Sequence, residues 1–369
     1  MLGCSADPNR LCAASLFLVV FLLISLPLLG LLISRQPIAP YLEFPPLTRH
    51  VPHATFSWPV FISLALLLAV VFVPCACRTI SAIASTRRPM KETHAFPAWG
   101  WLGLLLIAIT WSLAWTRLPW VATVQPFTFT PLWLGYIVVM NALTYRATGA
   151  CLLANRPRYL LVLFLLSTMF WWFFEYLNRF VQNWYYVGID EFSPSAYIFY
   201  ATLSFSTVLP AVVSTVEWLR SAERLRAAFQ NPTPIQVPLP ASIGWVVFAL
   251  AAAGLIGIGI WPDYLFSLLW VSPLLLVSAL QAMLGQDTIF SGLRHGDWRT
   301  LCLPALAGLQ CGFFWELWNW HSLAHWEYAI PYVDRFQIFE MPLLGYAGYL
   351  PFGLECVVLA ELFDVNRRQ

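Results

Sequence analysis

Two acid–amide pairs are the part of this sequence best suited to chemistry. Glu175 is followed by Asn178 and Glu316 by Asn319, each pair inside a strongly apolar stretch. On a helix a spacing of three places the acid and the amide on one face. Ionisable groups within a membrane span are costly and usually face a cavity or the bundle interior. We therefore interpret Glu175 and Glu316 as candidate acid–base residues of a shared polar cleft. The alternative is a structural carboxylate that is hydrogen-bonded to a neighbouring helix.

An aromatic pair follows each acid–amide pair. Trp184 and Tyr186 follow the first, and Trp326 and Tyr328 follow the second. Rings with one polar atom can hold an apolar substrate and still hydrogen-bond to it. We predict that these four residues, together with the two asparagines, bind substrate.

Two further acids of the second copy are candidate catalytic residues. Glu355 lies inside the last apolar stretch, and Ser214 stands at the matching position of the first copy. Such asymmetry is what a duplicated scaffold with one working site would show, so Glu355 is a candidate catalytic residue, with a structural role equally open. Glu340 opens the same stretch. It is a further catalytic candidate, or it interacts with the positive end of the helix.

His321 and His325 lie four positions apart, on one face if the segment is helical, and Glu327 follows them. Two imidazoles and a carboxylate can hold a transition metal. The first copy has Phe180 and Asn183 near the matching positions. We therefore expect interfacial, substrate-binding histidines and no metal.

The order Glu316, Trp326-x-Tyr328, Leu350-Pro351, Glu355 resembles the repeated units of membrane carotenoid (lycopene-type) cyclases. In that family the acid follows the proline directly or nearly so, often as a pair. Here Glu355 is single and lies four residues after Pro351. The resemblance covers part of each copy and implies a scaffold able to accommodate an isoprenoid.

The elements that must position these residues are membrane spans. The chain is 60% hydrophobic and 10% charged, far below the ~25% charge of soluble domains. We predict an all-α integral membrane protein, because lipid requires every backbone group to be satisfied within its own segment. The apolar blocks predict about ten transmembrane helices, near 13–34, 57–77, 97–116, 130–152, 159–178, 196–219, 241–261, 264–286, 299–319 and 338–363.

Matched spacings predict an internal duplication. The two acid–amide pairs are 141 residues apart, the two aromatic pairs are 142 apart, and Leu209-Pro210 recurs as Leu350-Pro351 at 141. We expect an N-terminal two-span segment with a basic cytoplasmic loop (1–96), a first four-span repeat (97–232) and a second (233–369). Four spans is an even number, so the two repeats should be parallel, related by an axis along the membrane normal.

The distribution of arginine and lysine predicts the orientation. With ten spans, 15 of the 20 basic residues fall on one face, which the positive-inside rule makes cytoplasmic. We expect both termini in the cytoplasm and the chain in the bacterial inner (cytoplasmic) membrane. The first apolar run is about 20 residues long, beyond the usual signal-peptide core, and predicts a retained span.

Several function classes are excluded or left open. The net charge of +2 gives no reason to expect nucleic acid as a partner. There is no Walker loop, dinucleotide fingerprint, serine elbow or His-Glu-x-x-His, so no cofactor is expected. The lipid bilayer and a lipid or isoprenoid ligand are the expected partners. Three hypotheses remain: an enzyme using acid–base chemistry on such a ligand, a proton-coupled transporter or flippase, and a non-catalytic membrane subunit.

Overall fold

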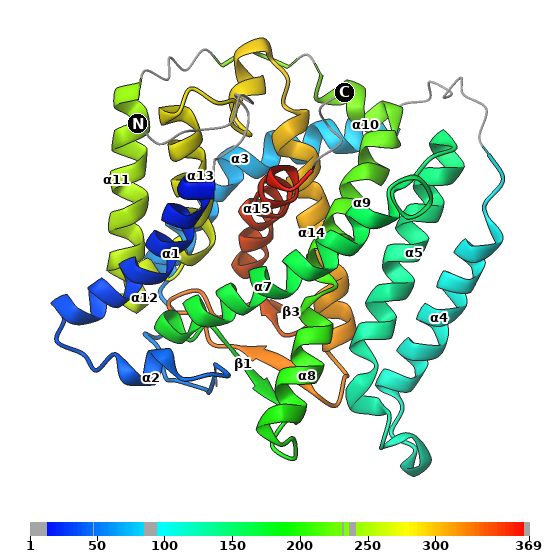
Figure 1. Cartoon of the computed structure of the whole chain (residues 1–369), viewed down its shortest axis with the longest axis horizontal. Coiled ribbons are helices and arrows are strands. Elements are labelled where there is room, and N and C mark those ends of the chain that lie inside the picture. The colour runs from blue at the N-terminus through cyan, green and yellow to red at the C-terminus, as the bar shows by residue number, and fades with distance from the viewer. Residues whose placement is uncertain (1–12, 47, 85–93, 231, 236–240, 365–369) are drawn as a thin grey trace.

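The computed structural model describes residues 13–46, 48–84, 94–230, 232–235 and 241–364. Within these ranges the chain is mostly helical, with two short antiparallel sheets. Figure 1 shows α14 and α15 near the centre, α4 and α5 on the right, and α11 and α13 on the left.

The first part of the chain forms α1 (Ala13–Ile33), α2 (Ala39–Leu42), α3 (Trp58–Ala84), α4 (Ala98–Trp115), α5 (Phe129–Thr148), α6 (Leu152–Asn155), α7 (Pro157–Val181), β1 (Trp184–Val187), α8 (Pro194–Phe205), α9 (Val208–Ser221) and α10 (Glu223–Ala228). The second part forms α11 (Ala241–Ile258), α12 (Pro262–Leu265), α13 (Leu268–Met283), α14 (Arg299–Asn319), β2 (His325–Tyr328), β3 (Gln337–Ile338), β4 (Met341–Pro342), the 3₁₀ helix η4 (Leu343–Gly348) and α15 (Tyr349–Leu362).

Eight helical segments within the described ranges are long and apolar enough to cross a membrane. A helix needs about 20 apolar residues to do so, and these segments have 18 to 28. Two further apolar helices, α11 and α13, are shorter over their described residues. The chain therefore has the composition and helices of a membrane protein, and its two shorter helices occupy places where the sequence predicts spans.

The last predicted span, 338–363, starts too early, because the candidate membrane-crossing segment runs from Leu343 to Leu362. The hairpin β3–β4 and η4 precede α15, so Glu340 lies in the hairpin turn and not at a helix N-terminus. Gly345, Gly348 and two prolines make this stretch a poor helix former. The predicted span 196–219 is interrupted as well, at the turn between α8 and α9.

A small antiparallel sheet joins the ends of α7 and α14. β1 pairs with β2 in the register Trp184 with Tyr328, Tyr185 with Glu327 and Tyr186 with Trp326. Each of these strands follows its helix after a short turn. The sheet therefore brings the two acid–amide pairs and the two aromatic pairs of the sequence into one region.

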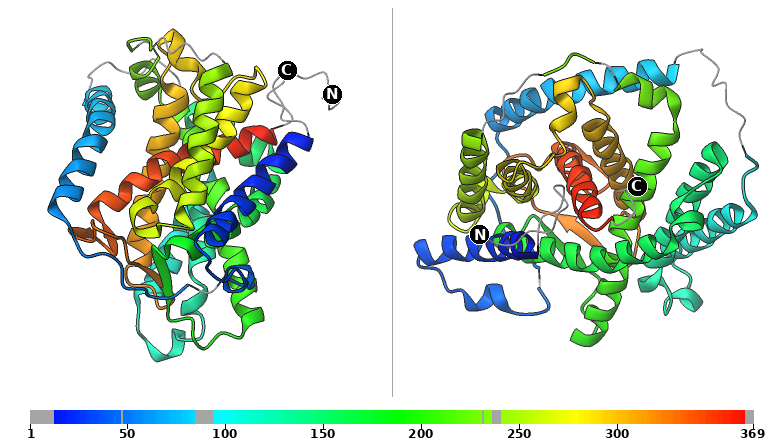
Figure 2. Two further views of the ribbon diagram at one scale, coloured as in Figure 1. Left: turned by 90° about the vertical axis from the view of Figure 1, so that its left-hand side faces the viewer. Right: turned by 45° about the horizontal axis from the view of Figure 1, so that its top comes forward.

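The helices pack in corresponding pairs. α4 packs on α5 and α11 packs on α13, while α15 packs on α14 and α9 packs on α7. The helix α3 differs from these packed helices, because none of its residues is buried. The left view of Figure 2 shows α3, in lighter blue, at one side of the body.

Candidate functional site

Two asparagines turn the chain from helix to strand. Asn178 donates from Nδ2 to the carbonyl of Trp184 at 2.8 Å, and its Oδ1 accepts from the backbone N–H of Asn183 at 2.8 Å. Asn319 donates to the carbonyl of Trp326 at 2.7 Å and accepts from the N–H of the same residue at 2.8 Å. Both amides are buried. The structure thus uses these predicted substrate-binding residues to fix the backbone that carries the aromatic pairs.

The strands present alternate residues to opposite sides, as a period of two requires. Trp184 and Tyr186 on β1, and Trp326 and Tyr328 on β2, line a cavity in the protein interior. Tyr185, between the members of the first pair, instead donates a short hydrogen bond from its hydroxyl to Glu327. The four-residue strands therefore direct all four predicted aromatic residues to one place.

The carboxylate of Glu175 accepts three hydrogen bonds on one oxygen. Trp171 and Trp184 donate from Nε1 to its Oε1 at 3.0 and 3.1 Å, and the Tyr186 hydroxyl donates at 2.6 Å. Trp171 lies one turn before Glu175 on α7, on the same face. The other two donors come from β1.

The carboxylate of Glu316 is held in a related way. The hydroxyls of Tyr328 and Tyr349 donate to its Oε1 at 2.7 and 2.5 Å. Trp326 donates from Nε1 to the Tyr328 hydroxyl at 2.8 Å. In this copy the strand tryptophan therefore supports the tyrosine, and a second tyrosine replaces a direct indole donor.

A compensated exchange explains the difference. Gly312 stands 141 positions after Trp171, and Tyr349 stands 141 positions after Val208. A Cβ at Gly312 would lie 2.2 Å from Cδ2 of Tyr349, so the Tyr349 ring fills the space that a side chain on α14 would need. Glu175 therefore has a donor, Trp171, from its own helix, whereas Glu316 has a donor, Tyr349, from α15.

Each carboxylate keeps one buried oxygen without a partner. Glu175 and Glu316 are both 0% exposed. Among the described residues, no hydrogen-bond donor reaches Oε2 of either side chain. A buried polar atom of this kind calls for a specific explanation, such as a proton or a role in chemistry.

An aromatic chamber lies between the two sets of donors. Its volume is about 150 Å³. The donors Trp171, Trp184, Tyr186, Trp326, Tyr328 and Tyr349 all contribute to its wall, together with Phe129, Trp270 and Trp315. Neither glutamate lines the wall. The sequence predicts a polar cleft, but the structure has an apolar chamber. Each carboxylate is separated from it by the aromatic side chains that donate to that carboxylate.

Two contacts tie the two copies together at the chamber. Trp184 of β1 lies 5.6 Å from Trp270 of α13, measured between ring centroids. Trp326 of β2 lies 5.8 Å from Phe129 of α5. Phe129 and Trp270 are also 141 positions apart. Each strand tryptophan therefore packs on a ring from the other half of the chain.

The tyrosines of the chamber remain neutral donors. Burial, and after it the negative charge of Glu175, raises the pKa of Tyr186 well above its usual value. Burial and Glu316 do the same to the pKa of Tyr328. Both hydroxyls therefore carry their protons at physiological pH and can donate to the carboxylates.

The two histidines are not on one helical face. α14 ends at Asn319, and His325 begins β2. The His321 ring packs on Trp320 and Trp115, at centroid distances of 4.1 and 5.2 Å. Nε2 of His325 lies 3.4 Å from Oε1 of Glu327, and His325 also borders the chamber. The helical premise is wrong here, and only His325 lies close to the candidate site.

Glu355 is next to a proline kink. Its Oε1 accepts from the backbone N–H of Leu274 at 3.1 Å. Pro273, inside α13, precedes that residue, and a helix-interior proline disturbs the local ladder. Ser214 and Leu132 stand 141 positions before Glu355 and Pro273. The contact with Leu274 supports a structural part for Glu355, whereas its Oε2, like those of Glu175 and Glu316, has no hydrogen-bond partner among the described residues.

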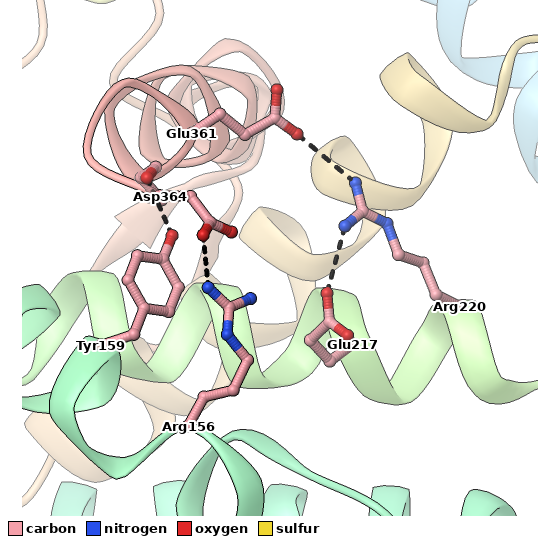
Figure 3. Close-up of polar contacts among 7 residues, drawn as sticks. Arg156, Tyr159, Glu217, Arg220, Glu361 and Asp364 are labelled. Atoms are coloured by element: carbon pink, nitrogen blue, oxygen red, sulfur yellow. Dashed lines mark hydrogen bonds and ion pairs between the residues drawn. The ribbon is translucent and has the colours of Figure 1, made fainter. Parts of the chain in front are cut away.

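A polar cluster closes the end of α15. Arg156 pairs with Asp364, and Arg220 lies 3.1 Å from Glu217 and 3.8 Å from Glu361 (Figure 3). These contacts tie α15 to α9 and to the start of α7. Asp364 is buried, so its carboxylate is a structural partner and not a solvated end group.

The fold and the site define a helical membrane protein with two buried carboxylates around an aromatic chamber. Comparison with protein-family models, with curated proteins and with solved structures finds no match.

Sequence reasoning missed five of the nine aromatic residues named in the chamber wall, which are Phe129, Trp171, Trp270, Trp315 and Tyr349. Trp171 is detectable in principle, because it lies four positions before Glu175 on the same helix. Tyr349 and Trp270 reach the chamber from other helices, and no local spacing indicates this. A sequence signal for Tyr349 is the glycine at position 312, which stands 141 positions after Trp171, and a signal for Trp270 is Phe129, 141 positions before it.

Proposed function

We propose that this protein is a membrane enzyme that carries out acid–base chemistry on an isoprenoid- or lipid-like substrate in the aromatic chamber. One observation carries the proposal. Each of two fully buried carboxylates is hydrogen-bonded by hydroxyl or indole groups whose rings line the same apolar chamber. The donors thus connect a hidden acid to an apolar substrate.

The chamber suits a ring-sized apolar group. A dry cavity of ~150 Å³ in another protein accommodates benzene, and the chamber measures about 150 Å³. Tryptophan and tyrosine faces attract cations. A wall of such rings would stabilise positive charge that develops on a hydrocarbon.

The proposed reaction moves one proton and conserves atoms. The step starts with the carboxyl group protonated. A tyrosine hydroxyl gives its proton to a carbon–carbon double bond of the substrate and takes the carboxyl proton as a replacement, which leaves a carboxylate. The resulting carbocation then loses a proton from a neighbouring carbon, and that proton returns through a tyrosine to a carboxylate. The product is an isomer of the substrate, with a shifted double bond or a new ring.

Glu316 is the better equipped of the two acids. A tyrosine hydroxyl both donates and accepts hydrogen bonds, whereas an indole N–H only donates. Glu316 contacts two hydroxyls, of Tyr328 and Tyr349. Glu175 contacts two indoles and one hydroxyl. We assign the first proton transfer to Glu316 and a supporting part to Glu175.

We also propose that the chain is a duplication of a four-span unit after two separate spans, with boundaries at 96 and 232. The strand register supports this, because the pairs Trp184–Tyr328 and Tyr186–Trp326 exchange under a shift of 142. Tyr185 and Glu327, directly opposite each other, are themselves 142 apart and would mark the two-fold axis. Location in the bacterial inner membrane, with ten spans and both termini cytoplasmic, is part of the proposal and rests on the basic residues alone.

A proton-coupled transporter is the second candidate. The ion pairs at the end of α15 favour it, because they join α15 to α9 and α7 as a closed gate would (Figure 3). Such a protein would use the same carboxylates without altering its substrate. A non-catalytic subunit would need neither carboxylate for function.

One experiment separates these functions. Lipid extracts of membranes that contain the native chain, Glu316→Gln or Glu340→Gln are compared by liquid chromatography and mass spectrometry. The enzyme predicts that a pair of isomeric lipids changes in ratio in Glu316→Gln alone, since Glu340 lies in a hairpin turn and does not itself line the chamber. Movement of an unaltered lipid across vesicles, driven by a proton gradient and lost in Glu316→Gln, would instead indicate the transporter.

A further inference from the structure

The helix α3 spans an apolar groove along the body of the protein. The groove has a volume of about 1220 Å³, above the ~300–1,000 Å³ of ordinary ligand pockets. Leucine, isoleucine, valine and phenylalanine predominate in its wall, which α3 shares with α13, α14 and α15. Its size and composition suit a hydrocarbon.

The helix α3 is fastened mainly at its ends. Before its first turn, the N–H of Ser57 donates to the carbonyl of Tyr332 at 2.9 Å. Near its other end, Arg78 donates to the carbonyl of Ala228 at 3.3 Å, and Arg224 donates to the carbonyl of Ile83 at 3.4 Å. None of its side chains is buried, and Figure 2 shows it beside the body. The helix therefore covers the groove as a strap.

The groove is longer than one leaflet of a bilayer. Its wall includes residues of α3 from Leu64 to Ile80, a rise of about 24 Å at ~1.5 Å per residue. One leaflet supplies about half of a hydrocarbon core that is ~30 Å thick. A single acyl tail of a phospholipid would therefore leave part of the groove empty.

Gly348 stands where the groove meets the chamber. It borders both cavities, as do Trp184, Trp270, Tyr328 and Gly345. Its φ and ψ are −60° and −30°, a conformation that any residue adopts. The nearest atom to a Cβ there would be Nε1 of Trp270, at 3.4 Å. Neither the backbone nor packing requires glycine at this position, and the missing side chain leaves space between the two cavities.

We propose that the groove under α3 binds a single hydrocarbon chain longer than one leaflet, whose end passes Gly348 into the aromatic chamber. The inference rests on the proposed function for what happens to that end. The inference adds the binding site for the rest of the hydrocarbon. It also adds the route by which the hydrocarbon enters, which is laterally from the membrane. In the first half Thr207, which is fully buried, stands 141 positions before Gly348. The second half alone would therefore have this opening.

Binding is tested on the full chain in phosphatidylcholine nanodiscs, with squalene as the long probe and hexadecane as the short one. The protein is recovered in detergent, and bound hydrocarbon is measured by mass spectrometry. Leu67 and Leu66 on α3 are each 65% exposed, but only Leu67 lines the groove. Leu67→Trp should reduce squalene retention at least tenfold, Leu66→Trp should leave it at the native level, and hexadecane should not be retained by any variant.

The passage at Gly348 is tested with squalene that carries a photoreactive diazirine at one end. The native chain should be labelled on Phe129, Tyr186 or Trp326, which line the chamber but not the groove, whereas Gly348→Leu should move the label to α3 and α15. Equal retention of the two probes, equal behaviour of the two leucine variants, or unchanged labelling in a folded Gly348→Leu would each overturn the inference. Squalene retention without isomer formation would contradict only the proposed function, and Glu316-dependent conversion without retention would contradict only the groove.

Discussion

Tyr349 occupies the space that a side chain at Gly312 would need, and its hydroxyl donates to Glu316 at 2.5 Å. The same hydrogen-bonding position at Glu175 is filled by Trp171 of the acid's own helix. The two carboxylates thus have similar surroundings that are built in different ways. Both accept hydrogen bonds from aromatic donors that line the chamber.

The variant Gly312→Ala should displace Tyr349 from Glu316. Its Cβ would meet Cδ2 of the ring at 2.2 Å, and overpacking of this kind costs about 1–3 kcal/mol. Thermal unfolding followed by tryptophan fluorescence in detergent should show a clear loss of stability. Gly348→Ala is the matched control, because its nearest neighbour would lie at 3.4 Å, and it should unfold at the native temperature. Equal unfolding temperatures for both variants would contradict the packing described.

Glu355 should prove structural. Glu355→Gln retains an oxygen for the N–H of Leu274 and should be nearly neutral. Glu355→Ala leaves that buried N–H unpaired, at a cost of about 1–3 kcal/mol. In a Pro273→Ala background the helix can satisfy the same N–H, so the cost of Glu355→Ala should shrink, as a double-mutant cycle would measure. A loss of lipid conversion in Glu355→Gln without loss of stability would show that this acid is catalytic instead.

The pair Tyr185 and Glu327 predicts a response to alkaline pH. Burial and then the hydrogen bond to Glu327 raise the pKa of Tyr185 to about 12, from ~10 in an unfolded chain. The folded protein holds the Tyr185 proton more tightly than the unfolded chain does. The stabilisation of the folded state by this group is therefore complete below pH ~10 and is lost as the pH rises towards ~12. The difference in unfolding temperature between the native chain and Tyr185→Phe should be constant up to pH 10 and then decrease. A difference that grows above pH 10 would contradict this sign.

Sequence reasoning predicted the helices better than the geometry between them. The bounds of α14 agree with the predicted 299–319. A long apolar run that begins at Arg299 and ends at a polar loop predicts a single membrane-spanning helix. The stretch before α15 is predicted as a span because its residues are mostly apolar, yet it forms β3, β4 and η4, with Pro342 in β4 and Gly345 and Gly348 in η4. The strands β1 and β2 were missed, since four residues give too short an alternation to detect.

For the candidate site too, the sequence predicts which residues take part better than it predicts the contacts between them. Glu175 and Glu316 and the four aromatic residues after them were found from spacing, and the structure places all four aromatic side chains at one chamber. Hydrogen bonds to the carboxylates from Trp171 and Tyr349 were not foreseen. A contact between side chains of different helices, such as Tyr349 with Glu316, depends on helix packing that a single sequence does not encode in any local pattern.

The central claim is that Glu316, through a tyrosine hydroxyl, delivers a proton to a carbon atom of a membrane lipid. Membranes containing the native chain are incubated in D₂O, and their lipids are separated and weighed by mass spectrometry. We predict an isomeric product that is heavier by one deuterium, formed by the native chain and by Glu340→Gln but not by Glu316→Gln. Product that forms without deuterium, or that forms equally in Glu316→Gln, would contradict the account.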